Sequence, residues 1–170
     1  MSEHPLVKLA RQTIETFIRE SKVIAPPADM TPEMKEKAGV FVSLHRQGEL
    51  RGCIGTFMPT TENVAAEIIR NAIESSTGDP RFPPMAADEL ADLEISVDVL
   101  NLPEPVASPA DLDPSCFGCI VKAGARRGLL LPDLPGVTTA DQQIAICKQK
   151  AGIGQNEKVD LFRFKVRRYN

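Results

Sequence analysis

Apolar residues recur at helical spacing near the start of the chain. Between Pro5 and Ser21 they fall on one face and polar or charged residues fill most of the rest, a pattern that predicts an amphipathic helix packed on a core. The apolar members of this face are Leu6, Val7, Ala10, Ile14, Phe17 and Ile18.

Two further helices are indicated by apolar stripes and capping residues. One begins at Thr60 or Thr61 and ends near Ser76, with an unbroken apolar stripe in between. The other begins at Thr139, whose spacing from Gln142 is that of a capping box. Gly152 ends this last helix.

Alternating apolar and polar residues predict strands in the rest of the chain. The clearest is Leu93 to Leu100, whose polar residues Glu94, Ser96 and Asp98 we expect to be solvated. Strands mixed with helices in this way predict an α+β fold. The other expected strands are 39–45, 50–56, 116–122, 128–131 and 159–167.

The proline-rich segment 101–115 reads as a connection and as the boundary of a small lobe at about 101–137 within a single domain.

The turn between the first two strands has two possible registers. With a three-residue loop from Arg46 to Gly48, Arg51 and Cys53 lie beside Ser43 and His45. With a two-residue loop at Gln47 and Gly48, the pair falls on the opposite face and Cys53 becomes a core thiol. We favour the first register, because burying Arg51 beneath valines requires a paired acid.

Composition narrows the classes of function. The 170 residues carry a net charge of −3, so no global field attracts nucleic acid or anionic membranes. No apolar run approaches the roughly 18 residues of a membrane span, and residues 1–11 lack a signal-peptide core. We therefore expect a cytoplasmic protein without membrane association. Its four cysteines are too few and too scattered for a disulfide framework.

The segment Leu50 to Thr56 is the first candidate for chemistry. Gly52 and Gly55 interrupt a strand, which indicates close approach of another group, either a ligand or a packed helix. Arg51 and Cys53 lie two positions apart, near enough for the guanidinium to favour a nucleophilic thiolate. The alternative is that Cys53 is an inert buried thiol.

The loop Asp79 to Pro84 is the second candidate, because it holds an acid, a base, an aromatic ring and three prolines in six positions. Arg81 suits a phosphate or carboxylate ligand, and Asp79 suits orienting it or taking a proton. The alternative is a structural clamp in which Asp79 caps backbone donors and pairs with Arg81.

Metal and nucleic-acid sites have weaker support. Cys116 and Cys119 have the spacing of half a zinc site, but no second pair follows, so we expect neither a metal nor a cofactor. Cys147 lies on the apolar stripe of its helix and reads as core. The basic row on the last strand, with Arg126 and Arg127, is the only footprint suited to RNA. That row comprises Arg163, Lys165, Arg167 and Arg168.

Four segments together resemble the AMMECR-type family, with matching order and spacing: 39–44, the hexapeptide 50–55, 79–84 and 128–132. The resemblance implies an α+β fold of two unequal lobes, the larger an antiparallel sheet with packed helices built from both chain ends, with a cleft between the lobes. It also implies a functional hexapeptide, in which Arg51 and Cys53 are the leading pair. In prokaryotes such proteins accompany a MEMO-like protein and a radical-SAM protein, which are the expected partners.

Three hypotheses follow. The first is a site for a small anionic or nucleotide-like ligand, with Cys53 as a reactive thiol, Asp79 as its acid and the two arginines as anion contacts. Gly52, Gly55, Ser43 and His45 complete that site. The second is a non-enzymatic adaptor using the same surface, and the third is an RNA-binding module. Whether the protein is an enzyme stays open at this point.

Overall fold

The structure, a computed structural model, describes residues 2–170 as two compact units. The first unit comprises residues 2–100 and 167–170, so it is built from both ends of the chain. The second comprises Asn101–Val166. Each unit holds a four-stranded antiparallel sheet together with helices, and the α+β class is confirmed.

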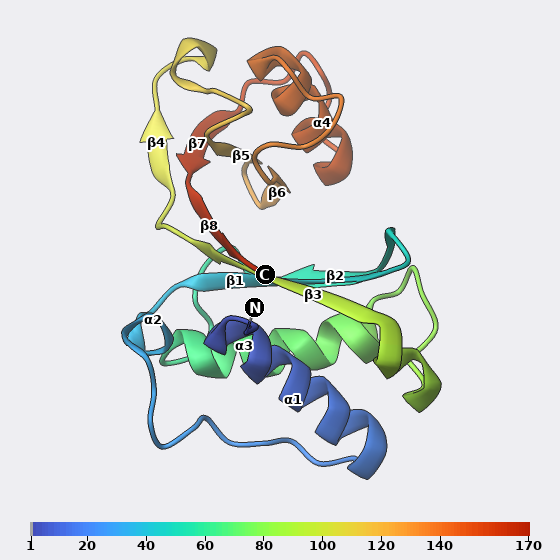
Figure 1. The fold of residues 1–170 in the computed structure, drawn as a ribbon. Helices are drawn as coiled ribbons and strands as arrows, with labels where there is room; N and C mark the ends of the chain where they lie inside the picture. Colours follow the sequence, from blue (N-terminus) through green and yellow to red (C-terminus); the bar gives the residue numbers. More distant parts are fainter. Residues whose placement is uncertain (1) are drawn as a thin grey trace. The chain divides into compact units, whose positions relative to one another are not determined.

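The sheet of the first unit has the strand order β2-β1-β3-β8 (Figure 1). Its helices α1 and α3 contact one another and pack on one face of this sheet, where the apolar residues of β1 and β3 are fully or nearly fully buried. The opposite face carries Ser43, Ser96 and Asp98 instead. The elements are α1 (Pro5–Glu20), α2 (Pro32–Lys35), β1 (Gly39–Arg46), β2 (Glu49–Gly55), α3 (Val64–Ile73), the π-helix η1 (Glu74–Gly78), the 3₁₀ helix η2 (Ala87–Asp92), β3 (Leu93–Leu100) and β8 (Val166–Tyr169).

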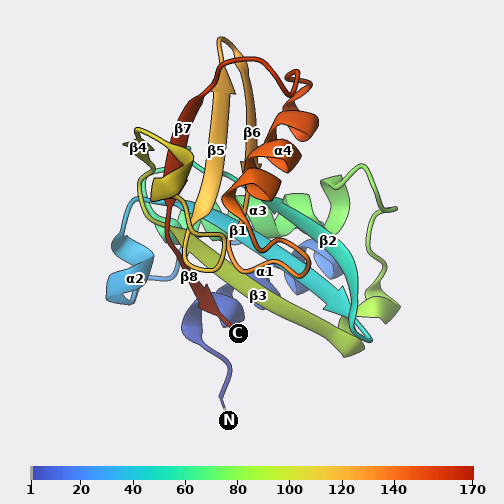
Figure 2. The ribbon, with the colours of Figure 1, turned by 90° about the horizontal axis from the view of Figure 1, so that it is seen from above.

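The sheet of the second unit has the order β4-β7-β5-β6, and α4 packs against β5 and β6 (Figure 2). The core between them includes the fully buried thiols of Cys119 and Cys147. The elements are β4 (Glu104–Val106), the 3₁₀ helix η3 (Pro109–Asp111), β5 (Gly118–Ala123), β6 (Arg126–Leu130), α4 (Ala140–Ala151) and β7 (Asp160–Phe164).

Several helix predictions are confirmed and one cap is wrong. The capping box of α4 forms between Thr139 and Gln142, and Gly152 ends that helix in the left-handed region at φ 68°. The cap of α3 is Asn63 and not Thr60 or Thr61, because its side chain accepts the N–H of Ala66 at 2.9 Å. After Ile73 the helix widens into the π-helix η1.

The predictions for segments 101–115 and 159–167 need correction. The segment 101–115 is more than a connection, since it contains β4, which pairs with β7. The expected strand 159–167 is two strands, β7 and β8, in different sheets. The second unit also runs past the segment 101–137 to Val166, because β7 pairs with β5 and α4 covers the same sheet.

Candidate functional site

The hairpin β1–β2 combines a two-residue turn with a bulge. Gln47 and Gly48 have φ values of 52° and 81°, as a type I′ turn requires, so the favoured three-residue loop is wrong. The register then shifts between Leu44 and His45, because Arg51 is an extra residue opposite no partner. The bulge returns Cys53 to the expected face, the one that carries Ser43 and His45; there Cys53 pairs with Ser43, while His45 pairs with Leu50.

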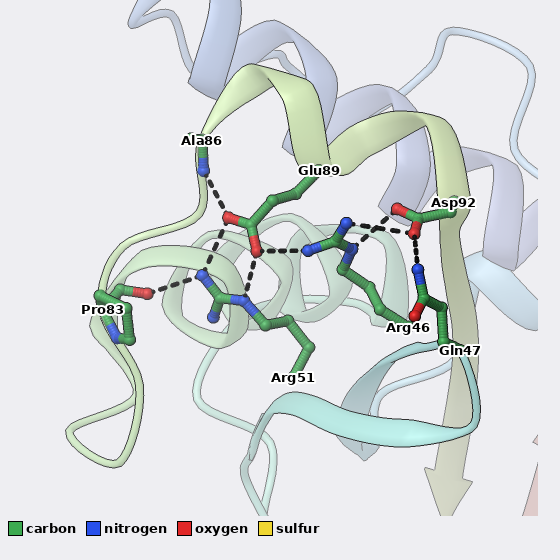
Figure 3. Close-up of polar contacts among 7 residues, drawn as sticks. All are labelled: Arg46, Gln47, Arg51, Pro83, Ala86, Glu89 and Asp92. Atoms are coloured by element: carbon green, nitrogen blue, oxygen red, sulfur yellow. Dashed lines mark hydrogen bonds and ion pairs between the residues drawn. The ribbon is translucent and has the colours of Figure 1, made fainter.

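Arg51 does not act on Cys53, contrary to our expectation. Its guanidinium forms two bonds with the carboxylate of Glu89, at 2.8 Å and 3.1 Å, and a third with the carbonyl of Pro83 at 2.9 Å (Figure 3). Only 12% of its side chain is exposed. The acid that a buried Arg51 requires is therefore Glu89, on η2.

Glu89 also joins Arg51 to Arg46. Its carboxylate lies between the two guanidinium groups and accepts the N–H of Ala86 as well, while Arg46 forms two further bonds with Asp92 (Figure 3). The hydrogen bonds from Arg51 lower the pKa of Glu89 to about 2. This cluster joins the tip of the hairpin to η2, and it occupies the guanidinium of Arg51 with protein acceptors.

The two glycines of the hexapeptide are both explained by close packing of protein atoms. A Cβ at Gly52 would overlap with the carbonyl oxygen of Ser75, because the end of η1 lies directly against β2. A Cβ at Gly55 would overlap with the ring of Phe41 on the neighbouring strand. The packed-helix alternative therefore accounts for Gly52, and the ligand role of both glycines stays a prediction.

Asp79 and Arg81 occupy the free edge of β2 at Cys53. One carboxylate oxygen of Asp79 accepts the backbone N–H of Cys53 at 3.0 Å, and Arg81 donates to the carbonyl of Cys53 at 3.3 Å. The two side chains also form a paired ion bridge, with distances of 3.0 Å and 2.8 Å. Together they contact the strand edge as a neighbouring strand would.

Burial differs sharply between these two partners. The side chain of Asp79 is 2% exposed, whereas that of Arg81 is 55% exposed. The hydrogen bonds from Arg81 hold the pKa of Asp79 well below its usual range, so this carboxylate is a poor proton acceptor. This low pKa disfavours the proton-taking role of Asp79, and its orienting role stays a prediction.

Cys53 is half-buried on the sheet face opposite the helices. Its sulfur lies 3.2 Å from the hydroxyl of Ser43, and Ser43 in turn pairs with Ser96 across β1 and β3. Cross-strand partners share a face, so one thiol and two hydroxyls form a row across three strands. His45 lies on the same face, opposite Glu94.

Burial raises the pKa of the Cys53 thiol above its ordinary value. The hydrogen bond with Ser43 and the charge of Arg81 lower it, but the charges of Asp98 and Asp79 add to the rise. The thiol is therefore neutral at physiological pH, which corrects the expectation of a thiolate favoured by Arg51.

A row of buried polar residues on α3 and η1 was not predicted from the sequence. Glu67, Asn71 and Ser75 are each at most 1% exposed and face β2 and the segment after it. Asn71 donates to the carbonyl of Val40, and Ser75 inserts its hydroxyl between the strands, accepting from the N–H of Ile54 and donating to the carbonyl of Val42. The carboxylate of Glu67 accepts from Thr56, Thr60 and Thr61.

This row continues into the site, because its members and Asp79 are four residues apart. The spacing of 67, 71, 75 and 79 is the one signal that the sequence offered, since it places polar side chains on a single helical face. Ser75 and Asp79 bind the backbone of β2 at Ile54 and Cys53, while Glu67 and Asn71 bind the hydroxyl of Thr56 just after the strand.

The basic row of the last strand is largely paired with acids. Arg163 pairs with Glu104, Arg167 with Glu36, and Arg168 with Asp98. Asp98 is only 1% exposed, so it is not solvated as expected. In the same way Arg126 pairs with Glu157. These pairs weaken the field that would attract RNA.

The remaining cysteines are dispersed. Cys116 is exposed whereas Cys119 is buried, and the thiol of Cys147 donates to the carbonyl of Cys119 at 3.5 Å. Cys147 is core, as expected. Within residues 2–170, no three His, Cys, Asp or Glu side chains are grouped so as to hold a metal ion. In the same range no helix is long and apolar enough to cross a membrane.

Comparison with known proteins gives a consistent match. The AMMECR1 family model matches residues 7–169. A protein of Thermotoga maritima is 51% identical over 99% of both chains. Protein CA_C1420 of Clostridium acetobutylicum is 47% identical over 97% of this chain, which spans only 36% of that longer protein.

One solved structure is similar throughout. The crystal structure of the uncharacterized protein PH0010 from Pyrococcus horikoshii has a TM-score of 0.88 and 35% identity, and it covers 96% of this chain and 88% of its own. The fold is thus similar across most of both chains.

Proposed function

This chain belongs to the AMMECR1 family, and from its site geometry we propose that the domain is a binding module that recognises a small anionic ligand through Arg81. The relatives found have no assigned activity, so the proposal rests on the residues themselves. The ligand class is a phosphate or a carboxylate, whose oxygens accept charge-assisted hydrogen bonds from a guanidinium.

The fixed and half-exposed guanidinium of Arg81 carries the proposal. Asp79, buried at 2% exposure, holds it through two bonds, and Cys53 accepts a third. An arginine that is already immobilised loses little conformational entropy on binding. The bonds within residues 2–170 use Nε and Nη2 of Arg81, so Nη1 is directed to no protein acceptor.

The neighbouring thiol suits binding better than catalysis. A neutral Cys53 donates a hydrogen bond, and Ser43 and Ser96 supply hydroxyl donors in the same row. We therefore assign Cys53 a contact role in place of the nucleophilic role considered first.

Titration with inorganic phosphate tests this proposal. Backbone amide shifts at positions 79, 81 and 82, the non-proline residues of the loop, are followed by NMR in the wild type and in Arg81→Gln, Cys53→Ser and Arg19→Gln. Arg19 is exposed on α1 and serves as the matched control for the lost charge. We expect saturable shifts in the wild type. The affinity for phosphate should fall about tenfold in Arg81→Gln and less than about threefold in Cys53→Ser.

Two results would overturn the proposal. One is unchanged phosphate affinity in Arg81→Gln. The other is an equal loss in Arg19→Gln, which would mean that phosphate responds only to net charge.

A protein-docking role is the second candidate, supported by the loop itself. Pro80, Arg81, Pro83 and Pro84 are exposed on a backbone that Asp79 anchors, and Phe82 lies 5.5 Å from the guanidinium of Arg81. Rigid loops that present arginine and aromatic residues are common in protein interfaces. The expected partners are a MEMO-like protein and a radical-SAM protein.

Copurification with each expected partner separates docking from ligand binding. In a docking role Phe82→Ala with Arg81→Ala reduces partner retention at least about tenfold, while Cys53→Ser retains it. Retention that is unaffected by the double variant would remove this candidate.

A further inference from the structure

A second candidate site lies wholly in the second unit, where an aromatic ring is flanked by two cations. A hollow of about 240 Å³ is formed at one end of β7. Its lining combines apolar surface, two basic groups and one acid: Asn101, Leu102, Glu104, Phe117, Arg163, Phe164 and Lys165.

Arg163 and Phe117 form a fixed platform in this hollow. The guanidinium of Arg163 lies 4.3 Å from the centre of the Phe117 ring, and it donates to Glu104 at 2.7 Å and to the carbonyl of Asp111 at 2.8 Å. The fully buried Gln143 of α4 donates to the carbonyl of Phe117 at 2.8 Å. Arginine planes and aromatic rings are the surfaces on which nucleobases stack.

Lys165 supplies a cation that is not paired with an acid. Its ammonium lies 5.5 Å from the centre of the same ring, and its side chain is exposed. Among residues 2–170 it forms no salt bridge, unlike Arg163, Arg167 and Arg168. A positive charge that the protein leaves uncompensated beside a ring platform favours an anion attached to a ring.

The rim of the hollow adds apolar and polar contacts. Leu102 is 67% exposed, so its apolar surface is open to a ligand. The carboxylate of Glu104 is exposed, and carboxylates accept hydrogen bonds from the amino groups of bases. A space of about 240 Å³ is smaller than a site for a drug-sized molecule, so it suits the base of a nucleotide, with the phosphate at the exposed Lys165.

We propose that this hollow binds a free nucleoside monophosphate, with the base against Phe117, Arg163 and Leu102 and the phosphate at Lys165. The base contributes stacking, and Lys165 contributes a salt-sensitive charge contact. The site is independent of Arg81 and shares no residue with the site of the proposed function.

Calorimetric titration of the full chain with AMP tests the proposal, with adenosine and ribose 5-phosphate as partial ligands. Lys165→Gln removes the charge, and Phe117→Leu removes the ring but keeps an apolar side chain. Lys158→Gln, exposed elsewhere in the second unit, is the charge control. Arg81→Gln reports on the site in the first unit, and thermal melting confirms that each variant folds.

We expect AMP to bind more tightly than either partial ligand. Lys165→Gln and Phe117→Leu each weaken AMP about fivefold or more, while Lys158→Gln and Arg81→Gln leave it unchanged. If phosphate binding were unchanged in Arg81→Gln, only the proposed function of the first unit would be rejected. The expected binding of AMP in the second unit does not depend on Arg81.

Any one of the following outcomes would overturn the proposal. They are no AMP binding at millimolar concentration, equal binding of ribose 5-phosphate and AMP, an equal loss in Lys158→Gln, and loss of AMP binding in Arg81→Gln. Binding of a single-stranded oligonucleotide without any binding of AMP would also reject a free nucleotide as the ligand.

Discussion

The carboxylate of Asp79 accepts the backbone N–H of Cys53 at 3.0 Å while it holds Arg81 with two further bonds. One buried acid thus fixes both the strand that carries the thiol and the arginine beside it. This relationship makes Asp79 a structural support of the candidate site and leaves Arg81 as its exposed contact.

Asp79→Asn should destabilise the first unit by about 2 to 4 kcal/mol at pH 7, because the amide cannot reproduce the charged pair with Arg81. The free energy of unfolding in urea measures this loss. Asp29→Asn, at an exposed position, is the control and should change stability by less than about 0.5 kcal/mol. Equal stability of Asp79→Asn and the wild type would contradict the role given to this carboxylate.

Glu89 should contribute to stability in a pH-dependent way. Its pKa falls from 4.5 to about 2 in the folded state, a difference equivalent to about 3 kcal/mol before discounting for solvent. Because the folded pKa is the lower one, this stability is present above pH 4.5 and is lost as the pH falls towards 2.

Urea unfolding of Glu89→Gln and the wild type at a series of pH values checks that sign. The variant should be less stable by about 2 to 3 kcal/mol at pH 7, and the gap should close on acidification. Glu62→Gln, at an exposed position, should show no such gap. A gap that stays constant down to pH 2 would exclude Glu89 as the titrating group.

Two glycine substitutions should separate close packing from backbone strain. Gly52→Ala places a Cβ on the carbonyl oxygen of Ser75, so we expect a loss of more than about 3 kcal/mol or failure to fold. Gly48→Ala meets open space at φ 81°, so only left-handed strain of about 1 to 2 kcal/mol applies. The same modest loss at both positions, read from thermal melts, would be inconsistent with this packing.

The four thiols should alkylate in an order set by burial. Iodoacetamide at pH 7.5 should modify exposed Cys116 first, Cys53 more slowly, and buried Cys119 and Cys147 last. Arg51→Ala should leave the rate at Cys53 nearly unchanged, because Arg51 contacts Glu89 and not the sulfur. Peptide mass spectrometry gives each rate, and a Cys53 that outpaces Cys116 would point to an activated thiol.

Local patterns predicted the elements whose causes lie within a few residues. The alternation from Leu93 to Leu100 defines β3 to the residue, and the Thr139 capping box begins α4. The shared face of Cys53 and Ser43 was predicted, although through the wrong loop. A bulge and a shorter turn together place Cys53 on the same face as the longer loop would, but opposite Ser43, where that loop would have placed Arg51.

The rest depended on partners distant in sequence. The bulged Arg51 finds its acid 38 residues away at Glu89, and nothing near Arg51 signals that pairing. Likewise Asp98 is buried because Arg168, 70 residues later, pairs with it. The sequence pattern favoured a solvated Asp98 and a thiolate at Cys53. The pairing of Asp98 with Arg168 and that of Arg51 with Glu89 become visible only in the folded structure.

Measuring the pKa of the Cys53 thiol is the most direct test of the proposal that the site binds a ligand without using a thiolate. A ¹³Cβ NMR titration of selectively labelled cysteine reports the pKa of each thiol. The burial of Cys53 predicts a pKa above the ordinary 9.0, so its resonance should stay that of the neutral thiol through pH 8. A pKa below 7.5 would contradict the account and reinstate Cys53 as a nucleophile.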